Sequence, residues 1–311
     1  MGRLRELVRA RLIRNGILFT SAQRRRLSVL VRGDQIAEET GGLCLRSRYV
    51  TPEVANRNQA LIWIASASAD RIAELDGSIP QLFDVIFPQG GRAPDARSPT
   101  PYLAFRYLIV NTPSTAKWIG PPPDRGWKTW VIPHHHCNRD GYRLPEARLA
   151  SPRVVGYVGE RTHLHDEGTL RRAVEEMGMV LRLFPSSALE AYKEIDIGVA
   201  WTGPDERRDQ SRSNVKLVNF QAHGIPCVVC DYESYRAVDE ALGGSTCLIR
   251  QSLEGFIEGL AELVASETLR HTLSKNGLRA FVAYSRRAIA SKYRECVKEC
   301  RAEWESRRTE R

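Results

Sequence analysis

Short apolar runs alternate along the chain with longer segments of helical periodicity. A short apolar run bounded by polar turns is typical of a strand that is buried on both faces. Six runs lie in the first half, at residues 17–20, 43–50, 60–65, 84–87, 107–110 and 129–132, and five in the second, at 153–158, 179–184, 197–201, 226–230 and 245–249. Strands that alternate with helices predict parallel sheets and therefore an α/β chain.

The helical segments follow the same division. Those at residues 168–176, 187–194 and 213–223 separate the later strands, which predicts a second doubly wound unit. Three more helices are expected at residues 252–266, 268–284 and 285–304. In the last one, apolar residues recur at intervals of four, three, four and four, so one stripe of it is expected to be buried: Ile289, Tyr293, Cys296, Cys300 and Trp304.

A chain of 311 residues is long enough for two domains. Residues 138–151 are polar, contain a proline and precede a new strand, so a domain boundary is expected there. We predict an N-terminal Rossmann-like domain over residues 1–138, a linker over 139–151 and a second domain over 152–284. Residues 285–311 are expected to form a helix that packs back on the first domain.

The formal charge of +9 favours anionic partners. We expect no nucleic acid among them, because no segment interleaves basic and aromatic residues as single-strand binders do. No apolar stretch approaches the roughly 20 residues that cross a bilayer, so a cytoplasmic protein is expected. Residues 1–15 are a basic amphipathic helix, and two interpretations stay open: a solvated terminal helix, or peripheral contact with an anionic membrane at its inner face.

Several common chemistries are disfavoured by missing motifs. The sequence has no Walker A loop, no Gly-x-Gly-x-x-Gly after its first strand, no Gly-x-Ser-x-Gly and no Asp-x-Asp. Its seven cysteines are scattered, which predicts reduced thiols rather than a disulfide framework. We expect no metal and no cofactor, and any phosphate group would be held by basic residues and a helix N-terminus.

The segment 213–223 carries the strongest chemical signal. Ser213 or Asn214 is a good N-cap, and Gly224 ends the helix. Lys216 lies in the first turn, where the helix macrodipole already favours negative charge. A diphosphate held by Lys216 and the free N–H groups of this turn would balance that arrangement, which places Ser213 and Asn214 in the predicted donor-binding set as well. The alternative is that Lys216 points to water.

Two further groups are candidates for binding or catalysis. Because successive residues of an extended segment point to opposite sides, at most two of His134, His135 and His136 can face one pocket. One of them is a candidate general base, and the alternative is a side chain that bonds to backbone carbonyls. Asp231 and Glu233 follow a predicted strand, where they would contact a sugar or cap a helix.

Residues 212–242, RSNVKLVNFQAHGIPCVVCDYESYRAVDEAL, carry a family resemblance together with IDIGVAW before them and LRHTLSKNGLRAFVAYS after them. They resemble the donor-binding domain of nucleotide-sugar-dependent glycosyltransferases of the GT-B fold, near the large group four-type family. The resemblance is clearest over residues 153–293. It implies two Rossmann-like domains that face a cleft, the first on the acceptor side and the second binding the donor.

The resemblance also implies roles for individual residues. Gly159, Glu160 and Arg161, within VGERTH, match the segment that meets the donor diphosphate, and Lys216 matches a basic residue with the same role. Many relatives carry two glutamates where this chain has Ser211 and Asn219, and Asn219 could still bond a ribose.

The resemblance places one more segment on the acceptor side of the cleft. This segment lies near the start of a first-domain helix and contains Arg32, Asp34 and Gln35. The alternative for this run is ordinary helix-start chemistry.

The function expected on these grounds is metal-independent transfer of a sugar from a nucleotide-diphosphate donor to a glycan or lipid-linked acceptor, as in polysaccharide and cell-envelope biosynthesis. Arg161, Lys216 and one of His134 and His135 would carry the chemistry. Two alternatives stay open: a non-catalytic module of the same fold, which the missing glutamates favour, and a sugar-nucleotide epimerase.

Overall fold

The computed structural model describes residues 8–9, 12–21, 29–67, 69–75, 77–85, 104–119, 127–203 and 212–310. Most of the basic helix expected at residues 1–15 lies outside these ranges. The chain divides into two compact units, Met1–Pro133 with Arg286–Arg311, and His134–Ser285. Residues 139–151, where a linker is expected, belong to the second unit and contain helix α6 (Glu146–Ala150).

The first unit is built on a six-stranded parallel sheet in the order β2-β1-β3-β4-β5-β6. Its strands are β1 (Ile17–Ser21), β2 (Leu43–Arg46), β3 (Ala60–Ile64), β4 (Gln81–Val85), β5 (Tyr107–Val110) and β6 (Lys128–Val131). Each predicted run overlaps one of them. Strand β2 is shorter than expected because a 3-10 helix, η2 (Ser47–Tyr49), follows it. The central strands are buried on both faces, as their continuous apolar sequence requires.

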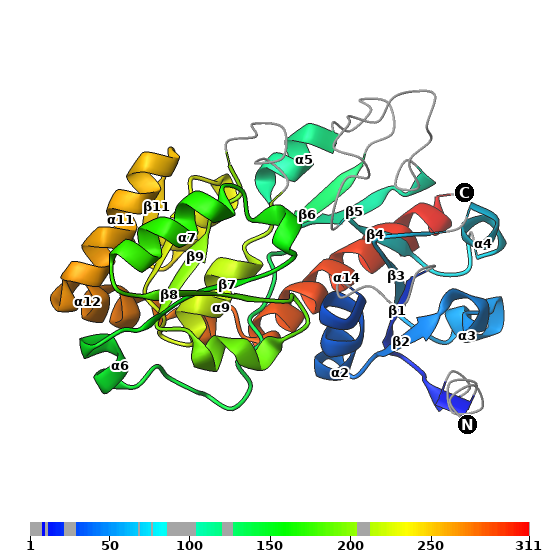
Figure 1. Cartoon of the computed structure of the whole chain (residues 1–311). Helices are drawn as coiled ribbons and strands as arrows, with labels where there is room; N and C mark the ends of the chain where they lie inside the picture. Colours follow the sequence, from blue (N-terminus) through cyan, green and yellow to red (C-terminus); the bar gives the residue numbers. More distant parts are fainter. Residues whose placement is uncertain are drawn as a thin grey trace. The chain divides into compact units, whose positions relative to one another are not determined.

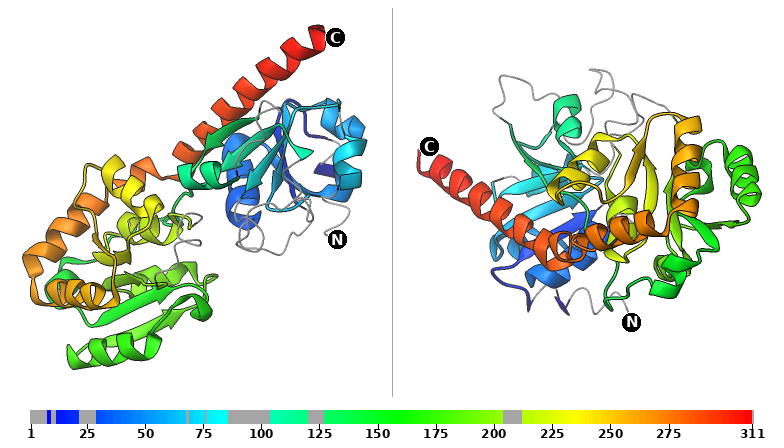
Figure 2. Two further views of the ribbon diagram at one scale, coloured as in Figure 1. Left: turned by 90° about the horizontal axis from the view of Figure 1, so that it is seen from above. Right: turned by 90° about the vertical axis from the view of Figure 1, so that its left-hand side faces the viewer.

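Helices of the first unit pack around this sheet (Figures 1 and 2). They are the π-helix η1 (Val29–Asp34), α2 (Gln35–Thr40), α3 (Pro52–Asn56), α4 (Ala69–Glu74), α5 (Pro113–Ile119) and α14 (Arg286–Thr309). Helix α14 packs against α2. Its predicted stripe is buried from Ile289 to Cys300, whereas Trp304 is only partly buried.

The second unit has a five-stranded parallel sheet in the order β11-β10-β9-β7-β8. Its strands are β7 (Val154–Val158), β8 (Val180–Phe184), β9 (Ile197–Ala200), β10 (Cys227–Cys230) and β11 (Leu248–Arg250). The chain moves from β7 to β8 in one direction and later from β9 to β10 in the other. Right-handed crossovers therefore put α7 (Glu167–Glu176) on the opposite face from α9 (Val215–Ala222) and α10 (Glu233–Ala241).

Two glycines let side chains approach this sheet closely. A Cβ atom on Gly198 would lie 2.6 Å from Phe220 Cδ1 of α9, and one on Gly156 would lie 2.2 Å from Ile195 Cγ1. The unit ends with α11 (Leu253–Ala265), α12 (Glu267–Gly277) and α13 (Ala280–Ala283). The single helix expected at residues 268–284 is thus two helices, and residues 189–194 form a 3-10 helix.

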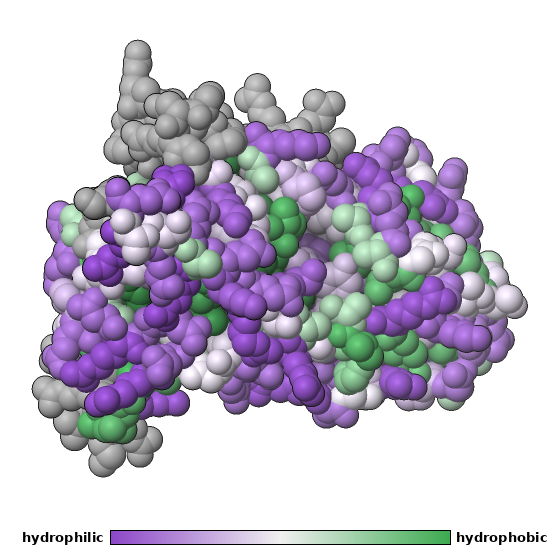
Figure 3. Space-filling view, turned by 180° about the vertical axis from the view of Figure 1, so that it is seen from behind, coloured by the Kyte–Doolittle hydropathy of each residue, from purple (hydrophilic) through white to green (hydrophobic). Residues whose placement is uncertain are grey.

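Most of the surface shown in Figure 3 is hydrophilic, with hydrophobic residues in small patches. This follows from burial of the apolar residues in two sheet cores. Among the described residues, no helix combines the length and apolar character that a membrane span requires.

A buried polar cluster joins the last helix to the first sheet. Arg32 Nε lies 2.8 Å from Asp84 Oδ2, and Arg32 Nη1 donates to the Ile132 carbonyl at 2.9 Å. The Tyr293 hydroxyl of α14 donates to the same Asp84 oxygen. Both ion-pair partners are at most 1% exposed. Burial raises the pKa of Tyr293 well above its ordinary value, so the phenol remains a donor at neutral pH.

We expect this cluster to be sensitive to loss of one partner. Arg32→Met would leave the Asp84 carboxylate buried without its cation, at a cost of about 3–5 kcal/mol in the free energy of unfolding. Tyr293→Phe removes only the hydroxyl donor and should cost about 1–3 kcal/mol. Urea unfolding followed by circular dichroism measures both.

Arg57→Met is the matched control, because Arg57 forms an exposed pair with Glu53 four residues away in the same unit. It should change the free energy of unfolding by less than about 1 kcal/mol. Equal losses in Arg32→Met and Arg57→Met would contradict a structural role for the buried cluster.

Candidate functional site

The candidate site lies at the carboxyl edge of the second sheet. The strand order reverses between β7 and β9, and ligands of doubly wound sheets bind beside such a reversal. Gly159 follows β7, and Thr202 lies just after β9. Helix α9 runs back from this edge, so Lys216 in its first turn lies here too.

Lys216 packs across the end of β7. Its Nζ lies 5.3 Å from the centroid of the Tyr157 ring. A Cβ atom on Gly159 would lie 3.0 Å from Lys216 Cε and 2.6 Å from the Tyr157 hydroxyl. Any larger residue at position 159 would therefore push the lysine away. The side chain is half-buried at the sheet edge.

The surroundings of Lys216 disfavour its positive charge. Burial, followed by the positive charge of Arg212, lowers its pKa from 10.5 to about 8. Among the described residues, no carboxylate lies within ion-pair distance of Lys216 or Arg212. The more distant charge of Glu160 acts in the opposite direction but forms no ion pair, so the site brings together two cations without a directly paired carboxylate within the described part of the chain.

Polar atoms without partners gather along the same edge. Thr202 Oγ1, Arg212 Nε and Ser234 Oγ are buried and make no hydrogen bond to the described residues. Thr202 follows β9, and Ser234 lies in the first turn of α10 after β10. Buried polar groups in proteins are normally bonded, so this group of donors is one that a polar ligand would satisfy. A carboxylate-rich metal site does not fit a group dominated by cations and hydroxyls.

Two asparagines of the predicted donor set fix the backbone of the histidine segment. Asn214 Oδ1 accepts from His134 N at 2.9 Å, and Asn214 Nδ2 donates to the His134 carbonyl at 3.2 Å. Asn219 Oδ1 accepts from Cys137 N at 2.7 Å and its amide donates to the Val215 carbonyl. Both side chains are buried, so their contacts hold residues 134–137 against α9. The N-cap position belongs to Asn214, with Ser213 outside the helix.

The three histidines are all buried in the second unit. His135 Nδ1 pairs with the His136 carbonyl, and His136 Nε2 pairs with the Phe281 carbonyl at 2.9 Å. The His136 ring stacks on Phe281 at 5.3 Å between centroids. These contacts match the backbone-bonded alternative for His135 and His136, and a general-base role for His134 or His135 stays a prediction.

Residues 159–161, which follow β7, lie in two different environments. Gly159 lies against Lys216, whereas Glu160 is exposed and accepts from Ser186 Oγ at 2.8 Å. The Arg161 side chain is 77% exposed and makes two bonds to Glu167, at 2.6 and 3.0 Å. Its guanidinium lowers the pKa of Glu167. Arg161 is thus held by a carboxylate in the absence of ligand, unlike Lys216.

The acidic candidates after β10 have partners as well. Asp231 pairs with Arg236 and accepts from Gln251 Nε2 at 2.8 Å. Glu233 is the first residue of α10, where a carboxylate stabilises the helix N-terminus. A sugar-binding role for either stays a prediction.

The acceptor-side candidates lie in the first unit. Arg32 is buried in the Asp84 cluster, which gives it a structural function. Gln35 is buried at the start of α2, and Asp34 is half-buried at the end of η1. Sequence reasoning did not select Thr202, Arg212 or Ser234. The signal for Thr202 was its position directly after a predicted strand, for Ser234 its place four residues after the next one, and for Arg212 its place two residues before the helix cap.

No family model matches the chain, and no curated protein matches it. The similarity lies with solved structures. Anabaena Alr3699/HepE, solved with UDP and glucose, is 13% identical with a TM-score of 0.59, covering 91% of this chain and 99% of that chain. AviGT4, a glycosyltransferase involved in avilamycin A biosynthesis, is 10% identical with a TM-score of 0.57, covering 93% and 98%.

The pneumococcal O-GlcNAc transferase GtfA, solved with UDP and GlcNAc, has a TM-score of 0.56 at 11% identity, and this chain spans 57% of its length. At such identities the likeness shows the fold. The chain has the GT-B fold of these glycosyltransferases, an α/β architecture with two Rossmann-like units, which confirms the predicted fold class.

Replacing Lys216 by methionine should stabilise the protein at neutral pH. The lowered Lys216 pKa, about 8 against 10.5, corresponds to a gain of about 1–3 kcal/mol in the free energy of unfolding. Between about pH 8 and pH 10.5 the unfolded chain binds more protons than the folded one, so the stability of the wild type rises with pH. The stability gained by Lys216→Met should therefore shrink over the same range. Urea unfolding at about pH 7 and about pH 10 measures the change.

Lys275→Met serves as the control, because Lys275 is exposed on α12. It should alter stability by less than about 0.5 kcal/mol at either pH. Destabilisation by Lys216→Met at neutral pH would contradict the unbalanced charge at this site.

Proposed function

We propose that this protein is a glycosyltransferase that takes a sugar from a nucleotide-diphosphate donor and binds the diphosphate at the carboxyl edge of the second unit. The observation that carries the proposal is the pair Lys216 and Arg212, two half-buried cations without a carboxylate partner among the described residues. They lie beside the strand-order reversal and the first turn of α9. A diphosphate matches this site in charge and in hydrogen bonding.

The chemistry follows from where charge develops. When the bond between the anomeric carbon and the diphosphate breaks, the leaving oxygen gains negative charge. Lys216, Arg212 and the unbonded N–H groups of the first turn of α9 would stabilise that charge. Thr202 and Ser234 supply further donors at the same edge. No metal is required for this role, so we propose a metal-independent reaction.

The remaining donor candidates take different parts in the proposal. Gly159 has no side chain, so the donor phosphates can come close to the backbone there. Arg161 would leave its ion pair with Glu167 and bind the phosphates instead. We propose that Asn214 and Asn219 support the site through residues 134–137 rather than contact the ribose, because their amides are already bonded.

The GT-B structures support a nucleotide-sugar partner, since two of them were solved with UDP and a sugar. We further propose a hexosyl-type transfer to a glycan or lipid-linked acceptor, in the cytoplasm or at the inner face of the membrane, as in polysaccharide and cell-envelope biosynthesis. The net charge of +9 suits a negatively charged acceptor or membrane.

Donor binding is tested by thermal unfolding with UDP-, GDP-, ADP- and CMP-sugars. One nucleotide class should raise the unfolding temperature, since ligand at 100 times its Kd adds about 2.7 kcal/mol. Lys216→Met should lower the affinity for that nucleotide sugar by at least about tenfold, whereas Lys275→Met should bind it as the wild type does. If no nucleotide sugar stabilises the protein and salt-sensitive binding to RNA or DNA is found, the proposal fails.

The affinity for the donor should depend on pH through Lys216. The pKa of Lys216 is about 8 without a bound anion. A bound diphosphate favours the ammonium form, so above that pH Lys216 must take up a proton when the donor binds. The Kd should be constant below about pH 8 and then rise up to about tenfold per pH unit. Isothermal titration across this range measures it, and Lys216→Met should show a flat profile.

The products formed with and without acceptor distinguish the three candidate functions. A transferase releases nucleoside diphosphate faster when acceptor is added, an epimerase changes the donor sugar without acceptor, and a non-catalytic module binds donor with no product. We expect acceptor-dependent release, lowered by at least about a hundredfold in Lys216→Met. Donor binding without release under any acceptor would favour the non-catalytic module, which the asparagine at position 219 also suits.

A further inference from the structure

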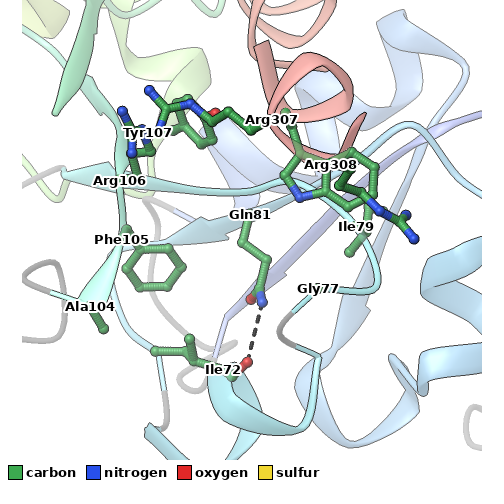
Figure 4. Close-up of a pocket in the computed structure, with 11 residues that line it drawn as sticks. Ile72, Gly77, Ile79, Gln81, Ala104, Phe105, Arg106, Tyr107, Arg307 and Arg308 are labelled. Carbon is green, nitrogen blue, oxygen red and sulfur yellow. Dashed lines mark hydrogen bonds between the residues drawn. The ribbon is translucent and has the colours of Figure 1, made fainter. Parts of the chain in front are cut away.

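A cavity of about 490 Å³ lies within the first unit, at the edge of the sheet opposite to the one where ligands of doubly wound folds bind (Figure 4). It opens at the amino ends of β4 and β5, where Gln81 and Tyr107 begin these strands. The last turns of α14 form another wall, with Trp304, Arg307 and Arg308. Its volume is in the range of small-molecule sites.

The cavity has an apolar body. Ile72, Ile79 and Phe105 line it, and Phe105 belongs to the buried core of the unit. Gln81 offers little to a ligand, because its amide donates to the Ile72 carbonyl and its oxygen accepts from Trp63 Nε1. A flat or branched hydrocarbon group therefore suits the interior.

The polar side of the cavity is cationic. Arg106, Arg307 and Arg308 lie around it, with Glu303 as the carboxylate that faces them. Glu303 is 3.4 Å from Arg106 and 3.2 Å from Arg307, while Arg308 stacks over the Trp304 ring at 4.7 Å. Among the described residues, three guanidinium groups against one carboxylate leave a surplus of positive charge at this wall.

A buried donor faces the same wall. The Tyr107 side chain is 4% exposed and its hydroxyl has no hydrogen-bond partner among the described residues. Figure 4 shows its ring beside Arg106 and Arg307. Burial raises the pKa of Tyr107 to about 12, so at neutral pH the group is an O–H donor. A buried hydroxyl without a partner is uncommon and points to a ligand that accepts from it.

We infer that this cavity binds a small anionic amphiphile, with an apolar body against Phe105 and Ile79 and a phosphate, sulfonate or carboxylate head held by Arg106, Arg307 and the Tyr107 hydroxyl. The inference does not depend on sugar transfer, because every residue in it belongs to the first unit. The cationic wall and the unbonded Tyr107 hydroxyl would recognise the anionic head, and the apolar interior would recognise the body of the ligand.

The test is isothermal titration of the full-length protein with 1-naphthyl phosphate, 1-naphthol and inorganic phosphate. The first should bind with 1:1 stoichiometry, and the other two at least about tenfold more weakly, because each lacks half of the recognised chemistry. Arg106→Gln should weaken 1-naphthyl phosphate by about tenfold or more, and Tyr107→Phe by several-fold. Arg301→Gln, a matched change on α14 at a residue that pairs with Glu305, should leave binding unchanged.

Two more variants keep the test decisive. Ala104→Trp enters the cavity from an exposed position without removing a buried bond, so it should block binding in a folded protein. Lys216→Met should bind as the wild type does; loss of binding there would assign the probe to the second unit and overturn the inference. Absence of binding at about 10 mM probe, or binding unchanged in Arg106→Gln, Tyr107→Phe and Ala104→Trp, would overturn it as well.

Discussion

The burial of the Lys216 ammonium beside a second cation, Arg212, is the constraint on which the candidate site depends. Two cations are held half-buried at one end of a parallel sheet, and no carboxylate among the described residues neutralises them. Such an arrangement costs stability in the free protein, because burial and like charge both disfavour the ammonium. Under the proposed function, an anion with several acceptor oxygens would make it favourable. Functional sites commonly contain groups whose charge is unfavourable until the ligand binds.

The rest of the second unit keeps this arrangement in position. Gly198 lets Phe220 of α9 pack directly onto the strands, which fixes this helix against the sheet, and Gly156 does the same for Ile195 after the 3-10 helix. Gly159 then leaves room for the lysine itself. Asn214 and Asn219 tie residues 134–137 to the same helix through backbone bonds. Asn214 and Asn219 therefore hold the backbone of the histidine segment, and a direct ligand contact for either stays a prediction.

The first unit uses its buried charges differently. Arg32 and Tyr293 both bond to the same oxygen of Asp84, and these bonds attach the C-terminal helix to the sheet. The same helix also supplies one wall of the cavity that Tyr107 faces, so its position decides the shape of that cavity. In the second unit, by contrast, Lys216 and Arg212 have no carboxylate within ion-pair distance among the described residues. Arg32, expected on the acceptor side, thus differs from Lys216 in having a carboxylate 2.8 Å away, although both are basic residues near a helix start.

The sequence by itself determined the local structure: nearly every strand, the parallel α/β architecture and the position of Lys216 in the first turn of a short helix ended by Gly224. These features depend on hydrophobic periodicity and backbone preferences, which act over a few residues. Only the tertiary structure decided which distant groups meet. Tyr293 reaches Asp84 across 209 residues, Asn219 bonds Cys137 across 82, and Thr202, Arg212 and Ser234 gather at one sheet edge. Such partnerships follow from strand order and helix packing, and no local pattern in the chain encodes them.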